Sequence, residues 1–238
     1  MNIAMIFAGG TGTRMNTKSK PKQFLELHGK PIIIYTLEKF DNHPLIDSIV
    51  VVCIKPWIQY LNTLIKKFNL TKIVSVVAGG ETGQESIYNG LCEVERLYPS
   101  DSIVLLHDGV RPLIDEETIT ENINCAIENG NAITVAPAVE TITLKENKNE
   151  VGKIIERSKC QMAKAPQTFI LKDIIDCHRR SQKDGYNEAI DSASLSAHYG
   201  YKLYTVVGSN ENIKITTPAD FFMFRAIMDA KENSQIFC

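Results

Sequence analysis

The chain has 238 residues, of which 44% are hydrophobic and 23% are charged, and its formal net charge at pH 7 is −2. This is the composition of an ordinary globular protein that can bury a sizeable core. The charge gives no basic surface for nucleic acid, and no apolar run is long enough to cross a membrane, so we expect neither as a partner.

The first element in the chain is an apolar run at 3–7, which predicts a buried strand. The glycine-rich segment 8–15 follows, and its backbone can turn sharply and present N–H groups to an anion. Arg14 and Lys22 add two cations just downstream. A strand, a glycine loop and two cations together predict a cradle for a polyphosphate.

This loop differs from two common phosphate-binding loops. The GxxxxGK[ST] run of a P-loop does not occur in the sequence. The GxGxxG fingerprint of dinucleotide-binding proteins also fails, because Met15 stands where the third glycine would be. An ordinary strand-to-helix turn remains the alternative interpretation.

Strand-like and helix-like segments alternate along the chain. Apolar residues recur at helical spacing in 33–40, 57–68, 86–94 and 119–127. Without a linker or repeat to divide the chain, we expect one α/β domain over 1–238 with a mostly parallel sheet, which would bind ligands beyond the carboxyl ends of its strands. Further strands are predicted at the apolar runs 49–54, 73–77, 103–106, 132–136 and 203–207.

Glycines also follow the predicted strand at 73–77. Gly80 lies in this turn, and Ser86 is expected to open the next helix. A glycine turn allows the close backbone approach that reading a small pyrimidine base requires. A plain strand–helix connection capped by Ser86 explains the pattern almost equally well.

The predicted strand at 103–106 is followed by the sequence HDGVRP, which contains Asp108 and Arg111. A carboxylate at a strand end beside a phosphate cradle can hold ribose hydroxyls or Mg²⁺, a cation that prefers oxygen ligands. Arg111 can donate paired N–H groups to a phosphate. A salt bridge within the loop is the alternative interpretation.

Residues 138–161 interrupt the alternation. Two β-prone runs, 141–144 and 151–155, flank the charged segment 145–150, which predicts a β-hairpin. An edge hairpin that lies on its own domain is the simplest interpretation of this pattern.

Near the C-terminus, Lys214 is flanked by Ile213 and Ile215, which predicts a short strand with the lysine directed away from the core. Thr217 and Pro218 then predict the N-cap and the first turn of a helix. On these residues alone, Lys214 is an ordinary surface lysine of an edge strand.

None of the five histidines clusters with another, so we expect no zinc site. The start of the chain lacks the three regions of a signal peptide, and a cytoplasmic location is expected. The six cysteines have no CxxC or metal-ligand spacing and are expected to be reduced: Cys53, Cys92, Cys125, Cys160, Cys177 and Cys238.

The loop AGGTGTRM and the PKQ that follows it resemble the signature of nucleotidyltransferases that make nucleotide-activated sugars and polyols. The longer run PKQFLEL is most similar to the cytidylyltransferases of polyol phosphates, a group that includes the 2-C-methyl-D-erythritol 4-phosphate and ribitol-5-phosphate enzymes. Similar motifs recur in order up to 212–216, so the resemblance covers nearly the whole chain. It implies a Rossmann-like nucleotidyltransferase domain that uses CTP, a polyol phosphate and Mg²⁺.

The resemblance also implies roles for individual residues. In this family the segment 138–161 is an arm that reaches over a partner subunit, so a homodimer is expected. The implied catalytic residues are Arg14, Lys22 and Lys214. The implied substrate-phosphate ligands are Arg111 and Arg157, and the implied metal ligand is Asp108. The implied nucleotide-binding residues are Ala8, Gly9, Gly10, Gly12, Gly80, Ser86 and Asp108.

The sequence departs from the family pattern in the substrate region. Gly83 stands where the family pattern GGxxRxxS has an arginine. Ala165 and Ile190 replace two hydroxyl-bearing positions of the methylerythritol pocket, and each change removes a partner for a polyol hydroxyl. Val110 resembles the ribitol-5-phosphate branch, since the methylerythritol enzymes usually carry alanine there.

These features predict an enzyme that transfers a cytidylyl group from CTP to a polyol phosphate, with release of pyrophosphate. A pentitol phosphate such as ribitol 5-phosphate is the favoured acceptor, which would yield a CDP-polyol for surface glycans such as teichoic acid or capsule. One alternative is the methylerythritol enzyme of isoprenoid precursor synthesis. The other is a nucleotide-binding regulatory module without turnover, which the missing arginine at Gly83 keeps open.

Overall fold

The structure is a computed structural model that describes residues 1–10 and 20–236, with side chains described as far as Asn233. The predicted loop residues Gly12 and Arg14 therefore lie outside the described residues. No described helix is both long enough and apolar enough to span a membrane.

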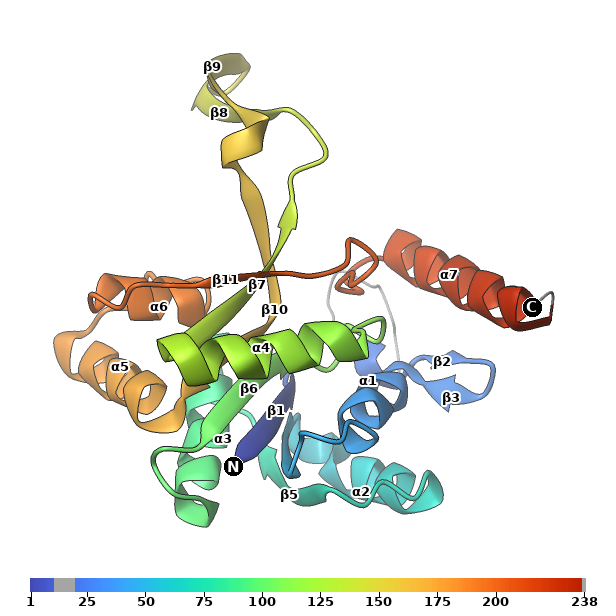
Figure 1. The fold of residues 1–238 in the computed structure, drawn as a ribbon. Coiled ribbons are helices and arrows are strands. Elements are labelled where there is room, and N and C mark those ends of the chain that lie inside the picture. Colours follow the sequence, from blue (N-terminus) through green and yellow to red (C-terminus); the bar gives the residue numbers. More distant parts are fainter. Residues whose placement is uncertain (11–19, 237–238) are drawn as a thin grey trace.

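A seven-stranded sheet forms the centre of the molecule, in the order β11-β7-β10-β6-β1-β4-β5 (Figure 1). β1 pairs in parallel with β4 and β6, while β10 is antiparallel to both of its neighbours, β6 and β7. This confirms the predicted mostly parallel α/β sheet. Its strands are β1 (Asn2–Ala8), β4 (Ser48–Cys53), β5 (Ile73–Ala78), β6 (Ile103–Asp108), β7 (Asn131–Pro137), β10 (Gln161–Ile170) and β11 (Thr205–Val207).

Helices cover both faces of the sheet because side chains alternate along each strand. In β1, Ala4 and Ile6 join the core on one face, whereas Ile3 and Met5 join the core on the other. The first face packs against α1 (Ile32–Asp41), α2 (Ile58–Lys67) and α4 (Glu116–Asn129). The second face packs against α3 (Gly83–Leu97), α5 (Leu171–Asp184) and α6 (Ser192–His198).

A third apolar cluster holds the C-terminal helix α7 (Pro218–Ile236) against the rest of the molecule. Phe224 of α7 is fully buried there with Ile32 and Ile215. The remaining short elements are η2 (Lys22–Phe24), β2 (Glu26–Leu27), β3 (Lys30–Pro31), η3 (Lys55–Trp57) and η4 (Arg157–Lys159).

Three local expectations are wrong in detail. Ser86 does not open α3: Thr82 is the N-cap, and its hydroxyl accepts from the amide of Glu85 at 3.1 Å. Ile127 is 65% exposed, because the apolar stripe of α4 ends one turn before the helix does. Lys214 lies in an irregular segment rather than in a strand.

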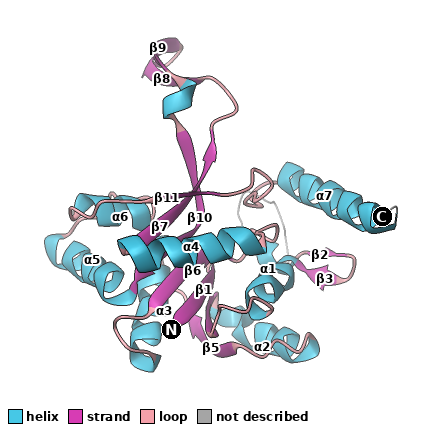
Figure 2. Cartoon of the chain, viewed as in Figure 1, coloured by secondary structure: helices cyan, strands magenta, loops and turns pink. Residues whose placement is uncertain are grey.

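The predicted hairpin forms, with longer strands than expected. β8 (Ile142–Asn147) pairs antiparallel with β9 (Glu150–Ile155), so only Lys148 and Asn149 remain for the turn. The two strands form a sheet of their own, which Figure 2 shows beyond the ends of β7 and β10 and away from the α-helices.

Candidate active site

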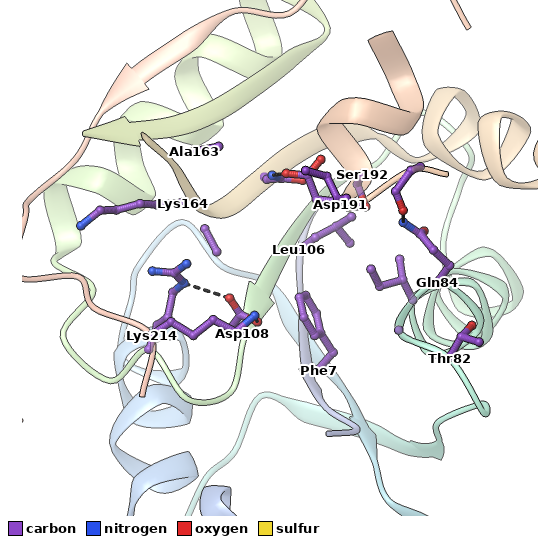
Figure 3. Close-up of a pocket in the computed structure, with 17 residues that line it drawn as sticks. Phe7, Thr82, Gln84, Leu106, Asp108, Ala163, Lys164, Asp191, Ser192 and Lys214 are labelled. Atoms are coloured by element: carbon purple, nitrogen blue, oxygen red, sulfur yellow. Dashed lines mark hydrogen bonds and ion pairs between the residues drawn. The ribbon is translucent and has the colours of Figure 1, made fainter. Parts of the chain in front are cut away.

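A cavity of about 420 Å³ opens at the carboxyl ends of β1 and β6 (Figure 3). This is the edge at which a parallel α/β sheet is expected to bind its ligand. Its walls come from the end of β6, the start of α3, β10 and the segment that leads into α6. The lining includes Phe7, Gly83, Gln84, Asp108, Arg111, Lys164, Ala165, Gln167, Ile190, Asp191 and Lys214.

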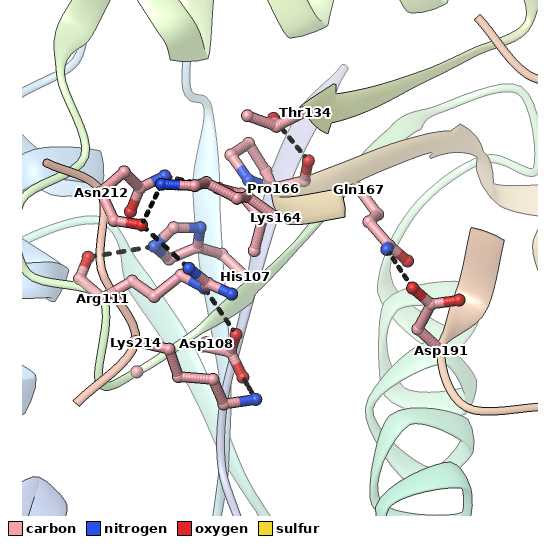
Figure 4. A network of polar contacts seen from close by, with 12 residues as sticks. His107, Asp108, Arg111, Thr134, Lys164, Pro166, Gln167, Asp191, Asn212 and Lys214 are labelled. Carbon is pink, nitrogen blue, oxygen red and sulfur yellow. Dashed lines mark hydrogen bonds and ion pairs between the residues drawn. The ribbon is translucent and has the colours of Figure 1, made fainter. Parts of the chain in front are cut away.

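Asp108 is the charged centre of this cavity. Its Oδ1 lies 2.6 Å from Nζ of Lys214, and its Oδ2 lies 2.9 Å from Nε of Arg111 (Figure 4). Burial alone would raise the pKa of Asp108, but the charges of Lys214 and Arg111 outweigh it and hold the pKa below its usual value. The carboxylate is therefore ionised and oriented by two cations.

The sequence left open whether Arg111 faces a ligand site or forms a salt bridge within its loop. It forms the loop salt bridge with Asp108, and it also lines the cavity. Its Nη1 donates to the carbonyl oxygen of Asn212 at 2.9 Å, which ties the loop after β6 to the segment before α7. The turn is tight: the amide of Gly109 donates to the carbonyl oxygen of Phe7 at 3.0 Å, close to the end of β1.

Lys214 reaches the site from an irregular segment that is fixed at its far end by the cap of α7. The carboxylate of Asp220 accepts from the amides of Thr216 and Thr217 at 2.8 and 2.7 Å. The helix begins at Pro218, as the sequence predicts. The irregular backbone is thus anchored two residues from the lysine.

Lys22 lies beside the same segment, with its Nζ donating to the carbonyl oxygen of Ile215 at 3.0 Å. The neighbouring residue Gln23 is buried and donates to the carbonyl oxygens of Ala8 and Gly10 at 2.7 and 3.3 Å. Gln23 therefore fixes the start of the glycine loop. This glutamine belongs to the PKQ motif, whose sequence alone indicated no role for it.

The two predicted glycine loops lie side by side. A smaller hollow of about 210 Å³ is lined by residues of both, including Gly9, Gly10, Gly80 and Ser86. The Ser86 hydroxyl accepts from the amide of Gly80 at 3.1 Å, and a Cβ atom at Gly9 would meet the same oxygen at 3.1 Å. Serine at this position therefore packs directly between the loops.

Arg157 is a predicted site residue that lies away from the cavity in this single chain. It is exposed in η4 at the base of the hairpin, and its Nη1 donates to the carbonyl oxygen of Val139 at 3.3 Å. Among the described residues, it is absent from the lining of the cavity around Asp108.

Two features of the cavity were missed by the sequence analysis. Lys164 lines it and donates to the carbonyl oxygen of Asn210 at 3.0 Å. Gln167 donates to the carboxylate of Asp191 at 2.8 Å and accepts from the amide of Ala193 at 3.0 Å, which joins β10 to the cap of α6. Both residues belong to the conspicuous segment 164–169. Their hydrogen-bond partners lie far away in the chain, so the sequence pattern does not reveal these contacts.

The arrangement suits the binding of anions. Arg111, Lys164 and Lys214 line the cavity with Asp108 between two of them, so positive charge is in excess near its centre. In the part of the chain that the structure describes, no three His, Cys, Asp or Glu side chains are grouped as metal ligands.

Comparisons with known proteins agree with this geometry. Residues 2–230 match the family model of 2-C-methyl-D-erythritol 4-phosphate cytidylyltransferase, IspD. The chain is similar to proteins named ribitol-5-phosphate cytidylyltransferase from Vibrio parahaemolyticus, at 56% identity over 100% of both chains, and from Streptococcus agalactiae, at 52% identity over 100% of this chain and 99% of the relative.

The fold is similar to that of a solved enzyme. A crystal structure of 4-diphosphocytidyl-2C-methyl-D-erythritol synthase from Anaerococcus prevotii superposes with a TM-score of 0.83, at 27% identity over 96% of each chain. The family match, the full-length relatives and the cation-lined cavity at the carboxyl edge of the sheet lead to one conclusion. The chain belongs to the IspD family of cytidylyltransferases.

Proposed function

We propose that this cytidylyltransferase transfers the cytidylyl group of CTP to ribitol 5-phosphate, giving CDP-ribitol and pyrophosphate. The observation that carries the proposal is the buried Asp108 carboxylate between Lys214 and Arg111, next to the two glycine loops. The names of the full-length relatives at 56% and 52% identity support the choice of acceptor.

In the proposed reaction, a phosphate oxygen of the acceptor attacks the α-phosphorus of CTP, and the bond to the β-phosphate oxygen breaks as pyrophosphate leaves. A phosphate monoester is already ionised at neutral pH, so no general base is needed. The protein has to align two anions and neutralise the charge that develops between them. Lys214 and Lys22 supply cations on one side of the site, and Arg14 of the glycine loop is proposed to act with them.

The site fits Mg²⁺ as a cofactor held mainly by its substrate. Asp108 offers one ionised carboxylate at the cavity, and Mg²⁺ in nucleotide enzymes is commonly bound by one or two carboxylates together with phosphate oxygens and water. Bound there, Mg²⁺ would neutralise negative charge on the phosphates of CTP. The two cations on Asp108 would then be shared with those phosphates.

The cavity wall supports a pentitol phosphate over methylerythritol phosphate. Ala165 and Ile190 line the cavity and offer no side-chain hydrogen bond at positions where the methylerythritol pocket presents hydroxyls. Val110 is buried behind Arg111 and agrees with the ribitol branch. The methylerythritol enzyme and the module without turnover are therefore not favoured.

We also propose a homodimer in which the hairpin carries Arg157 to the partner's site. Arg157 is exposed, and the hairpin exposes the apolar side chains of Leu144, Val151 and Ile154 by 53%, 65% and 64%. A contact with a second chain would cover them. A cytoplasmic location agrees with the unpaired state of the five described cysteines.

The test is pyrophosphate release from each of the four nucleoside triphosphates across a panel of polyol phosphates, with and without Mg²⁺. The proposal expects release with CTP and ribitol 5-phosphate well above all other pairs, and only with Mg²⁺. Equal rates with all four nucleotides would overturn the cytidylyl assignment. A higher rate with another polyol phosphate would overturn the acceptor alone.

A further inference from the structure

The side chain of Lys164 points at backbone carbonyls rather than at an acidic group. Its Nζ lies 3.2 Å from the carbonyl oxygen of Ser209 and 3.0 Å from that of Asn210. It also lies 3.4 Å from the carbonyl oxygen of Asn212 (Figure 4). Within the described residues, this ammonium forms no ion pair with a carboxylate. Burial, and then the nearby charge of Arg111, lower the pKa of Lys164. The Lys164 ammonium is therefore partly desolvated, and among the described residues it is stabilised by carbonyl dipoles.

The carbonyls belong to the irregular segment 209–215, which carries Lys214. Hydrogen bonds from other elements hold this segment in place. The side-chain amide of Asn212 donates to the carbonyl oxygen of Ala165 at 2.7 Å, and Arg111 donates to the carbonyl oxygen of Asn212 at 2.9 Å. Beyond Lys214, the amide of Ile215 donates to the carbonyl oxygen of Val110 at 2.9 Å.

We infer that Lys164 is a positioning residue: by gathering the carbonyls of 209–212, it holds Lys214 at the Asp108 carboxylate. The inference rests on the proposed catalytic role of Lys214. Three carbonyl oxygens that converge on one point repel one another unless a cation lies between them. Without the ammonium, the carbonyls of Ser209 and Asn210 would turn towards water. The segment would then lose the Lys164 contacts with β10 and keep the hydrogen bond between Asn212 and Ala165.

A direct contact between Lys164 and the substrate is the competing role. A lysine ammonium has three N–H donors, and three carbonyl oxygens lie within reach of them here. No donor is left for a substrate phosphate while the segment keeps this position. The geometry therefore favours an effect on the placement of Lys214 over an effect on substrate affinity.

The first test needs no catalysis. Amide hydrogen exchange of peptides covering 209–216 is compared between the wild-type protein and Lys164→Met, with β6 as the internal reference. Lys172→Met, which removes an exposed lysine of α5, is the matched control. Faster exchange over 209–216 in Lys164→Met alone supports the inference. Equal exchange in all three proteins overturns it, whatever their activity.

The second test separates placement from binding through kinetics. Lys164→Met should lower kcat by about 10- to 100-fold, the cost of misplacing a catalytic group, with little change in KM for the acceptor. Lys164→Arg should recover part of the loss. In a Lys214→Met background, Lys164→Met should lower kcat by less than about threefold, because the effects of coupled residues are not additive.

A selective rise in KM for the acceptor with unchanged kcat would show that Lys164 binds substrate, which overturns the positioning role. If Lys164→Met lowered kcat as strongly in the Lys214→Met background as in the wild-type protein, the positioning role would be overturned as well. If the wild-type protein shows no cytidylyl transfer to any polyol phosphate, the proposed function fails. Hydrogen exchange over 209–216 then decides the inference by itself.

Discussion

The ammonium of Lys214 lies 2.6 Å from the carboxylate of Asp108, which joins the end of β6 to the segment before α7. The two residues are far apart in sequence, and neither forms the site alone. Asp108 without its cations would be a costly buried charge, and Lys214 without Asp108 would be a surface lysine. The pair therefore holds a buried carboxylate and a cation together at the edge of the cavity.

Replacement of Asp108 by asparagine should keep the shape of the site and remove its charge. We expect kcat to fall by about 10²–10³, the scale of one lost electrostatic contact, and the free energy of unfolding to fall by about 1–3 kcal/mol as Arg111 loses a buried partner. Pyrophosphate release and urea unfolding measure the two effects. Asp101→Asn, just before the opposite end of β6, is the control and should change neither.

Removal of the Lys22 side chain should also slow the reaction. Lys22→Ala deletes a cation beside the segment of Lys214, so kcat should fall by about 10²–10³. Lys20→Ala is a matched control, because Lys20 belongs to the same stretch and forms an ion pair with Glu26 at 2.7 Å near the surface. Turnover at the wild-type rate in Lys22→Ala would show that the cation acts elsewhere.

The choice of acceptor can be reversed in part by restoring hydroxyls to the cavity wall. Ala165→Ser and Ile190→Thr should raise kcat/KM for 2-C-methyl-D-erythritol 4-phosphate relative to ribitol 5-phosphate. One hydrogen bond to a substrate hydroxyl is worth about 1–3 kcal/mol, or roughly five- to 150-fold. Side-by-side assays of both acceptors measure the ratio. A wild-type preference for methylerythritol phosphate would overturn the acceptor assignment and leave the cytidylyltransferase assignment intact.

Assembly can be tested by shortening the hairpin. Replacement of 141–155 by a short Gly/Ser turn removes β8 and β9 and should convert a dimer into a monomer, since the exposed apolar side chains of the hairpin are lost. Light scattering gives the mass of both proteins in solution. An intact protein that is monomeric and active would contradict the dimer and the role of Arg157 in the partner's site.

Stability should depend on pH through two buried histidines. Burial lowers the pKa of His107 and of His178 to about 4, below the ordinary value of 6.5. The unfolded chain binds the proton more readily between these values, so acidification from pH 6.5 to 4 destabilises the fold by up to about 3 kcal/mol for each histidine.

His178→Phe should keep the ring contact with Tyr88 and remove one of these titrations. Urea unfolding at several pH values should then show a shallower fall in stability below pH 6.5 than in the wild-type protein. Above pH 7, the free energy of unfolding should change with pH to the same extent in the variant and in the wild-type protein. Identical slopes over the whole range would show that the pKa of His178 is the same in the folded and the unfolded chain.

The sequence predicted the elements whose patterns are simple. The strands β1, β4, β5, β6 and β7 are continuous apolar runs, and the helices α1 and α3 show regular stripes, so both could be located. β10 was missed because its first residues are exposed and form no continuous apolar run, and because Pro166 lies within it, where the register with β7 shifts. A proline inside a run usually argues against a central strand.

The sequence also predicted part of the candidate site. Asp108 and Arg111 were found because they are charged residues directly after an apolar run, whereas Lys214 was found only through the resemblance to the family. The structure brings the three residues together. Lys164 could not be found in this way. Its partners are backbone carbonyls of a distant segment, and backbone atoms leave no trace in the order of side chains.

Because β10 runs antiparallel to its neighbours, it leads from the hairpin to the cavity. Its first residues continue directly from the base of the hairpin, and a few residues later Lys164, Ala165 and Gln167 form a wall of the cavity. One strand therefore connects the base of the hairpin to the wall of the cavity without an intervening loop.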